Sequence, residues 1–194
     1  MSDAADGRAA RLVAALERRR AHGALVAPAD VGTHVPGLAA GWGTARALCA
    51  ADGLLERLGV YDALAGRGVE VLRWPDGRGG GWRELLGLEG PTATLGVTVP
   101  DLAVAERGTL LLSAGRGHGR SLDAVSERHL AVLPESRIRE TLAEALAERF
   151  RADGGRPAAV SLVSGPSRTS DIEKISTLGA HGALSMHVLV VAGM

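Results

Sequence analysis

Segments typical of strands alternate with segments typical of helices from residue 66 onward, and this order limits the fold more than any other feature of the chain. Such alternation predicts a mostly parallel sheet with helices on both faces, because each parallel connection must cross over one face of the sheet. The sequence therefore predicts an α/β fold. The predicted strands are Val69–Trp74, Thr92–Val99, Thr109–Ser113, Leu130–Leu133, Ala158–Val163 and His187–Val191, and the predicted helices run from Pro100 to Gly108 and from Pro134 to Arg151.

The N-terminal third of the chain is organised differently. Residues 4–21 repeat apolar side chains at intervals of three and four, the pattern of an amphipathic helix. Residues 28–43 are rich in proline, glycine and polar side chains and predict a loop, and residues 44–65 predict a helix with breaks near two glycines. We therefore expect an N-terminal helix within residues 1–23, packed on a single α/β domain of residues 24–194.

The composition excludes several classes of protein. The 22 basic and 22 acidic residues cancel, so bulk charge does not direct the chain to nucleic acid. One cysteine, Cys49, cannot form an internal disulfide and cannot supply the thiolates of an iron–sulfur cluster or a cysteine-held zinc. No apolar run approaches the roughly 20 residues of a membrane helix, and the first residues lack the apolar core of a secretory signal. These features predict a cytoplasmic protein.

The stretch from Val160 to His187 carries the clearest candidate for a binding site. An apolar run meets a turn at Ser164-Gly165-Pro166, and the polar residues Ser167-Arg168-Thr169-Ser170 follow. A helix is then predicted from Asp171, with Ser170 and Glu173 at capping-box spacing and a stop at Gly179. Free N–H groups at such a helix start bind anions, and an arginine adds a planar fork of donors. The alternative is that these residues are only caps and turns, with Arg168 in a surface salt bridge to Asp171.

Loops that follow parallel strands converge at one edge of a sheet, so three loops are expected to meet. They are residues 98–106, 113–121 and 164–171, and a fourth loop lies near His181. We expect Ser167, Arg168, Thr169, Glu106 and His181 to share one crevice, with Glu106 or His181 able to transfer a proton. The alternatives are that Glu106 is a surface residue and that a backbone carbonyl fixes His181. The spacing of His181 and His187 does not fit a zinc site, so no metal is predicted.

Two segments resemble a known family. SGPSRTSDIE followed by GAHGALSMHV, and LGVTVPDLAVAERGTLLL at residues 95–112, resemble the signature segments of the LUD domain family, and within it the lactate utilisation protein C group. The resemblance covers about residues 90–192. Two residues depart from the family pattern: Arg107 replaces a small hydroxyl residue, and Ala183 replaces a proline.

The resemblance implies both a fold and a role. The fold would be that of the superfamily of ribose-phosphate isomerase, glucosamine-phosphate deaminase and CoA-transferase. The role would be to support oxidation of L-lactate to pyruvate with iron–sulfur partner subunits, since this chain has no cysteine cluster of its own. The predicted anion-binding residues are Ser164, Gly165, Ser167, Arg168, Thr169, Asp171 and Thr109. The alternatives are a stand-alone isomerase- or transferase-like enzyme acting on a phosphorylated or CoA-linked substrate, and a non-catalytic scaffold.

Overall fold

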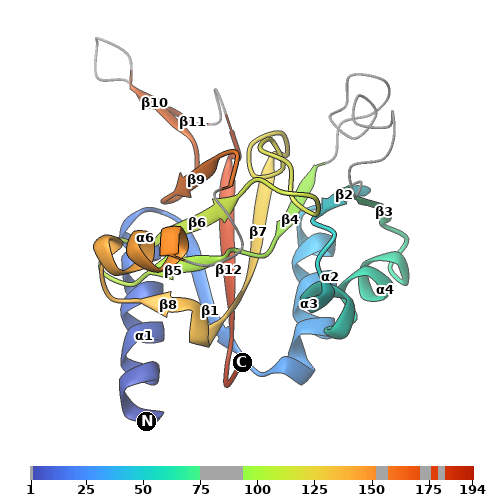
Figure 1. Cartoon of the computed structure of the whole chain (residues 1–194). Coiled ribbons are helices and arrows are strands. Elements are labelled where there is room, and N and C mark those ends of the chain that lie inside the picture. The colour runs from blue at the N-terminus through green and yellow to red at the C-terminus, as the bar shows by residue number, and fades with distance from the viewer. Residues whose placement is uncertain (1, 75–93, 152–156, 171–175, 179–181) are drawn as a thin grey trace.

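A six-stranded parallel sheet forms the centre of the computed structural model, which describes residues 2–74, 94–151, 157–170, 176–178 and 182–194. Its strands lie in the order β1-β12-β7-β4-β2-β3, and every neighbouring pair is parallel, so the predicted α/β class is confirmed (Figure 1). The strands are β1 (His22–Val26), β12 (Ser185–Val191), β7 (Arg128–Pro134), β4 (Leu95–Thr98), β2 (Arg46–Cys49) and β3 (Glu70–Arg73).

Successive residues of the central strands are buried on opposite faces of the sheet. On β7, Leu130 and Val132 pack into one apolar cluster, while Ala131 and Leu133 pack into another. This follows from the two-residue period of a strand, and it explains why the sequence of such a strand is apolar without alternation.

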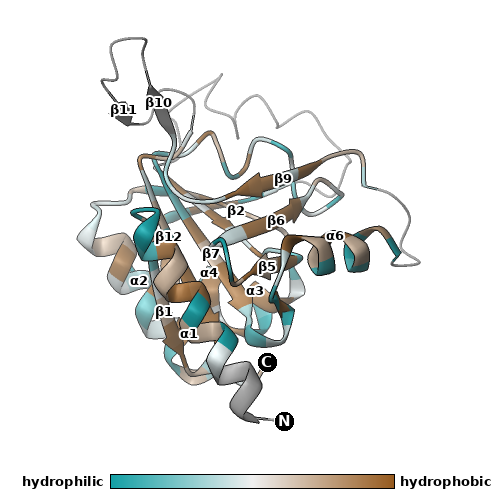
Figure 2. Ribbon diagram, turned by 90° about the vertical axis from the view of Figure 1, so that its left-hand side faces the viewer, coloured by the Kyte–Doolittle hydropathy of each residue, from teal (hydrophilic) through white to brown (hydrophobic). Residues whose placement is uncertain are grey.

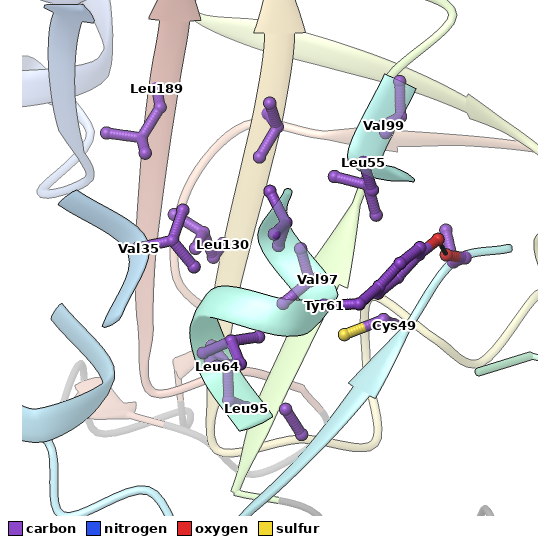
Figure 3. Packing of buried hydrophobic residues seen from close by; sticks show 14 of the residues in the cluster. Val35, Cys49, Leu55, Tyr61, Leu64, Leu95, Val97, Val99, Leu130 and Leu189 are labelled. Atoms are coloured by element: carbon purple, nitrogen blue, oxygen red, sulfur yellow. Dashed lines mark hydrogen bonds between the residues drawn. The ribbon is translucent and has the colours of Figure 1, made fainter. Parts of the chain in front are cut away.

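Three short helices cover the first face. They are α2 (Val31–Gly41), α3 (Gly53–Arg57) and α4 (Val60–Ala65). Val35 of α2 and Leu64 of α4 are fully buried, and they pack in one cluster with Leu130 and Leu189 of the sheet (Figure 3). Tyr61 of α4 donates its hydroxyl proton to the Ala50 carbonyl at 2.7 Å, which ties this helix to the end of β2.

The second face is covered by a helix and a second sheet (Figure 2). The helix is α1 (Ser2–Arg18), and Leu12 and Leu16 on its inner side are fully buried. The second sheet has the order β8-β5-β6-β9, from β8 (Ile138–Arg139), β5 (Leu102–Val104), β6 (Thr109–Ser113) and β9 (Val160–Val163). Helix α6 (Leu142–Arg151) packs on its outer side, where Ala145 is buried against Leu111 and Val104.

Several predicted elements were wrong. Residues 100–108 were expected to be a helix, but Leu102–Val104 is strand β5, buried on both faces. Residues 28–43 were expected to be a loop, but Val31, Val35 and Ala39 form the buried side of α2, so burial outweighed the local effect of its proline and glycines. Residues 46–49, within a predicted helix, form strand β2 for the same reason. The helix predicted from Pro134 begins only at Leu142. It is preceded by a 3-10 helix, Glu135–Arg137, and by the short strand β8, Ile138–Arg139.

The helix predicted after Ser170 is also wrong over Ser176–Leu178, the part of it that the structure describes. Arg168–Ser170 is strand β10, and it pairs in antiparallel fashion with β11, Ser176–Leu178. Because Ser176–Leu178 pairs in a ladder, these three residues cannot belong to the predicted helix. Figure 1 shows this hairpin projecting from the end of the molecule opposite the two termini. The predicted loop at 75–81, the predicted helix at 82–88, Asp171, Glu173, Gly179 and His181 lie outside the described residues.

Within the described ranges, no helix has both the length and the apolar character needed to cross a membrane.

Candidate functional site

The turn after β9 brings together the small polar residues that the sequence singled out. The Ser164 hydroxyl lies 2.8 Å from the Thr109 hydroxyl on β6, and the two share a hydrogen bond. Gly165 has φ +131°, and a Cβ there would lie 2.9 Å from the Arg19 carbonyl oxygen, so this position needs glycine. The Ser167 N–H donates to the Ala183 carbonyl at 2.8 Å, which joins the turn to the segment before β12.

These residues form one wall of a pocket of about 300 Å³. The pocket lies at the amino end of the parallel sheet, where β7 and β12 begin. His129 and Met186, the second residues of these two strands, line it. Its polar wall comes from the turn after β9, and its floor from the sheet. The lining residues are Asp123, Ala124, His129, Leu162, Val163, Ser164, Gly165, Ser167, Gly182, Ala183 and Met186.

His129 is the most deeply buried polar side chain of this pocket, with 1% of its surface exposed. Its Nε2 atom lies 2.7 Å from the Thr98 hydroxyl at the end of β4. Its Nδ1 atom is buried and has no hydrogen-bond partner among the residues that the structure describes. Burial, and secondly the charge of His118, lower the pKa of His129 to about 4, so the ring is neutral at pH 7.

Asp123 is the second unusual polar group of the pocket. Its Oδ1 atom is buried, and no described residue provides it with a hydrogen bond. Burial raises the pKa of this carboxyl above the ordinary value, against the opposing effects of a backbone hydrogen bond and of His118. Buried polar atoms without partners are rare in native proteins, so two of them on one small pocket favour a polar ligand there.

The structure places some of the predicted site residues at this pocket and others elsewhere. Ser164, Gly165 and Ser167 line the pocket, and Thr109 supports it through Ser164. Glu106 lies elsewhere: its carboxylate is partly exposed, 3.3 Å from the Arg107 Nε atom, and it accepts a hydrogen bond from the Leu142 N–H at the start of α6. The backbones of Arg168 and Thr169 belong to β10, directly after the pocket residues. Asp171 and His181 are not described, so their predicted roles stay predictions.

The expected convergence of three loops rested on the assumption that all strands share one parallel sheet. Strands β6 and β9 instead pair with each other in antiparallel fashion in the second sheet. The loop after β9 therefore lies near the amino end of the parallel sheet, while the loops after β4 and β6 meet at its carboxyl end.

A second pocket, of about 190 Å³, lies at that carboxyl end. The chain passes from β2 to β3 on one side and returns to β4 on the other, so β2 and β4 flank the point at which the strand order reverses. Asp52 follows β2, and Asp101 follows β4. Open α/β sheets bind ligands at this kind of point.

His118 closes the second pocket from the loop after β6. Both of its ring nitrogens are buried and lack hydrogen-bond partners within the described part of the chain. Burial lowers its pKa, although Asp123, Asp101 and Asp52 oppose the shift. The loop can lie this close to β2 because residue 117 is glycine: a Cβ there would fall 2.3 Å from the Ala51 carbonyl oxygen.

The described residues contain no group of three or more His, Cys, Asp and Glu side chains placed to hold a metal ion. Cys49 is buried in the core, and burial raises the pKa of its thiol to about 12.

A family model described as the LUD domain matches residues 9–191 of this chain. The chain belongs to the LUD domain family. This confirms the resemblance stated above, and the matched range includes most of α1.

Two relatives of this LUD domain chain share a name. Lactate utilization protein C of Shouchella clausii is 34% identical over 101 residues, which are 51% of this chain and 44% of that protein. Lactate utilization protein C of Halalkalibacterium halodurans is 30% identical over 143 residues, which are 72% of this chain and 60% of that protein. The chain thus spans about half the length of the curated relatives that it matches.

A solved structure shares the fold of this LUD domain. The crystal structure of a DUF162 family protein from Deinococcus radiodurans matches with a TM-score of 0.58 and 21% sequence identity, over 95% of this chain and 98% of that chain.

Sequence reasoning missed His129 and Asp123. His129 directly precedes the apolar residues Leu130–Leu133 of β7, and a histidine at the start of a buried strand was a usable signal. Asp123 lies in a stretch without regular structure, and only the fold places it beside β7.

Proposed function

We propose that this LUD domain chain is a lactate utilisation protein C-like subunit that supports oxidation of L-lactate to pyruvate together with iron–sulfur partner subunits. The name of the two relatives described above, lactate utilization protein C, supports a role in the use of lactate. The oxidation releases two electrons and two protons, and the electrons need a carrier. Cys49 is the one cysteine, and its buried, protonated thiol is unsuited to bind iron, so partner subunits would supply the clusters.

Within this role, the pocket beside Ser164 would hold a small anion such as a carboxylate. The observation that carries this part is the gathering of the Ser164 and Ser167 side chains with the neutral ring of His129 around about 300 Å³. Hydroxyl and imidazole N–H groups donate to carboxylate oxygens, and in a buried site such hydrogen bonds are stronger than in water. Arg168, next along the chain, is proposed from the sequence to add a cation.

Two measurements test the proposal. Affinity purification of the tagged chain from its native host should recover cysteine-rich iron–sulfur proteins, and recovery of the chain alone would contradict the complex. A thermal-shift titration with L-lactate and pyruvate should raise Tm, because a ligand that binds only the folded state stabilises it. Ser167→Ala and Arg168→Ala should reduce that shift. The matched control is Thr33→Ala, which removes an exposed hydroxyl on α2 and should leave the shift unchanged.

The second pocket favours one alternative function. Its position at the carboxyl ends of β2 and β4 is where a stand-alone isomerase- or transferase-like enzyme would bind a phosphorylated or CoA-linked substrate. Under this alternative, a sugar phosphate or CoA raises Tm, and His118→Asn abolishes that rise while Ser167→Ala does not. A panel of these ligands that leaves Tm unchanged would contradict it.

A further inference from the structure

The hydrogen bond between Thr98 and His129 restricts where the ring proton of the histidine lies. Thr98 is fully buried, and His129 has 1% of its surface exposed. The Thr98 Oγ1 atom and the His129 Nε2 atom are 2.7 Å apart, so one of the two donates a proton to the other. A neutral imidazole carries one ring proton, and the choice of donor decides which nitrogen has it.

The two arrangements leave different numbers of polar groups without partners. If Nε2–H donates to Thr98, the Thr98 hydroxyl proton has no acceptor among the described residues, and the Nδ1 lone pair has no donor. If the Thr98 hydroxyl donates to Nε2, the hydroxyl proton is used, and only the Nδ1–H remains without a partner in the described part of the chain. Because each unpaired buried group is costly, the second arrangement is favoured.

We propose that Thr98 is a positioning residue that fixes His129 as the Nδ1–H tautomer, so that this N–H donates to an oxygen atom of an anion bound beside Ser164 and Ser167. The identity of the ligand rests on the proposed function, whereas the tautomer does not. The substrate class that follows is a small oxyanion recognised by neutral donors: one imidazole N–H and two hydroxyl groups.

The surroundings of the ring support this assignment. The ring stays neutral at pH 7 because its burial lowers the pKa to about 4. Thr98 and His129 lie on adjacent parallel strands, β4 and β7, and Thr98 is two residues beyond Gly96, the residue opposite His129 in the ladder. Both residues of this pair lie on paired strands, which limits the side-chain entropy that the imidazole would lose on binding.

The test uses the native chain with histidine labelled with ¹³C and ¹⁵N. The nitrogen and carbon chemical shifts of a neutral imidazole distinguish the two tautomers, so NMR spectra at pH 7 report the position of the proton. We expect native His129 to be the Nδ1–H form. Thr98→Val, which keeps the shape but lacks the hydroxyl, should lose this preference, and Thr98→Ser should retain it. An Nε2–H form in the native chain overturns the inference, even if Thr98→Val does not fold.

A binding titration with L-lactate, and with acetate as a minimal carboxylate, completes the test. Thr98→Val should weaken binding about tenfold, the scale of one hydrogen bond to a charged group, while Thr98→Ser should stay within about twofold. Equal affinity of native and Thr98→Val chains overturns the donor role. If neither carboxylate binds the native chain, the proposed anion site is contradicted, and an observed Nδ1–H form still confirms the role of Thr98 as a positioning residue.

Discussion

Gly96 on β4 lies directly opposite His129 on β7 in the register of the parallel pair. The pairing matters because a Cβ at residue 96 would fall 2.7 Å from the Leu122 carbonyl oxygen and 3.2 Å from the Ser126 hydroxyl. The missing side chain lets residues 122–126 pack against the sheet. That packing places Asp123 on the wall of the pocket that His129 lines.

Gly96→Ala is therefore expected to destabilise the chain by about 1–3 kcal/mol, the usual cost of forcing an extra carbon into a packed core. Urea unfolding followed by circular dichroism measures the change. Gly37→Ala is the matched control, since Gly37 is exposed on α2 and a Cβ there meets no atom within 4 Å. The control should be neutral or slightly stabilising. Equal free energies of unfolding for native and Gly96→Ala chains would contradict the close packing.

Acid should destabilise the chain through His129. Its folded-state pKa of about 4 lies below the ordinary value of 6.5, so between these pH values the unfolded chain binds a proton that the folded chain does not. The stabilisation is complete above pH 6.5 and is lost as pH falls toward 4, by on the order of 3 kcal/mol. His187, whose pKa burial also lowers to about 4, acts in the same direction.

Urea unfolding at pH 7, 5.5 and 4.5 measures this dependence. His129→Asn should make the slope of unfolding free energy against pH shallower, and Thr33→Ala, which removes a group that does not titrate from the exposed side of α2, should leave the slope unchanged. A native slope that His129→Asn does not alter would count against the assignment.

Cys49 should be inert in the folded chain, because it is buried and its thiol pKa is about 12. A thiol reagent such as iodoacetamide at pH 8 should leave the native chain unmodified and should modify it fully in 6 M guanidinium chloride (a denaturing concentration of about this size is needed). Mass spectrometry gives the result directly. Rapid modification without denaturant would show that the core around β2 opens.

Asp123→Asn should tighten binding of a carboxylate. The amide keeps the shape of the side chain but cannot carry the negative charge that repels an anion. Burial raises the pKa of the native carboxyl, so the native chain should lose affinity as pH rises through that pKa, and the variant should not. Isothermal titration calorimetry at two pH values checks both points, and weaker binding by the variant would contradict the assignment.

The fold class followed from the sequence, but the pairing of the strands did not. Thr109–Ser113 was correctly predicted as a strand, since its leucines are buried on both faces. Nothing in its periodicity indicates that it pairs with Val160–Val163 in a separate antiparallel sheet. Partner choice depends on contacts between residues about 50 positions apart, and local patterns do not record these.

Only some of the residues that line the pocket stood out in the sequence. The turn chemistry of Ser164, Gly165 and Ser167 is local, so the sequence indicated it correctly as a polar turn. His129 and Asp123 reach the same pocket only because β7 lies next to β4 and because residue 96 is glycine. Glu106 was assigned to the site on the assumption of one parallel sheet, and the second sheet instead places its carboxylate at the start of α6.

The most direct test of the anion pocket is an NMR titration of the amide-labelled native chain with L-lactate. Binding beside the turn after β9 predicts that the amide signals of Gly165, Ser167, His129 and Ala183 shift together and saturate. Shifts confined to Ala51, Gly117 and His118 around the second pocket, or no shifts at all, would contradict it.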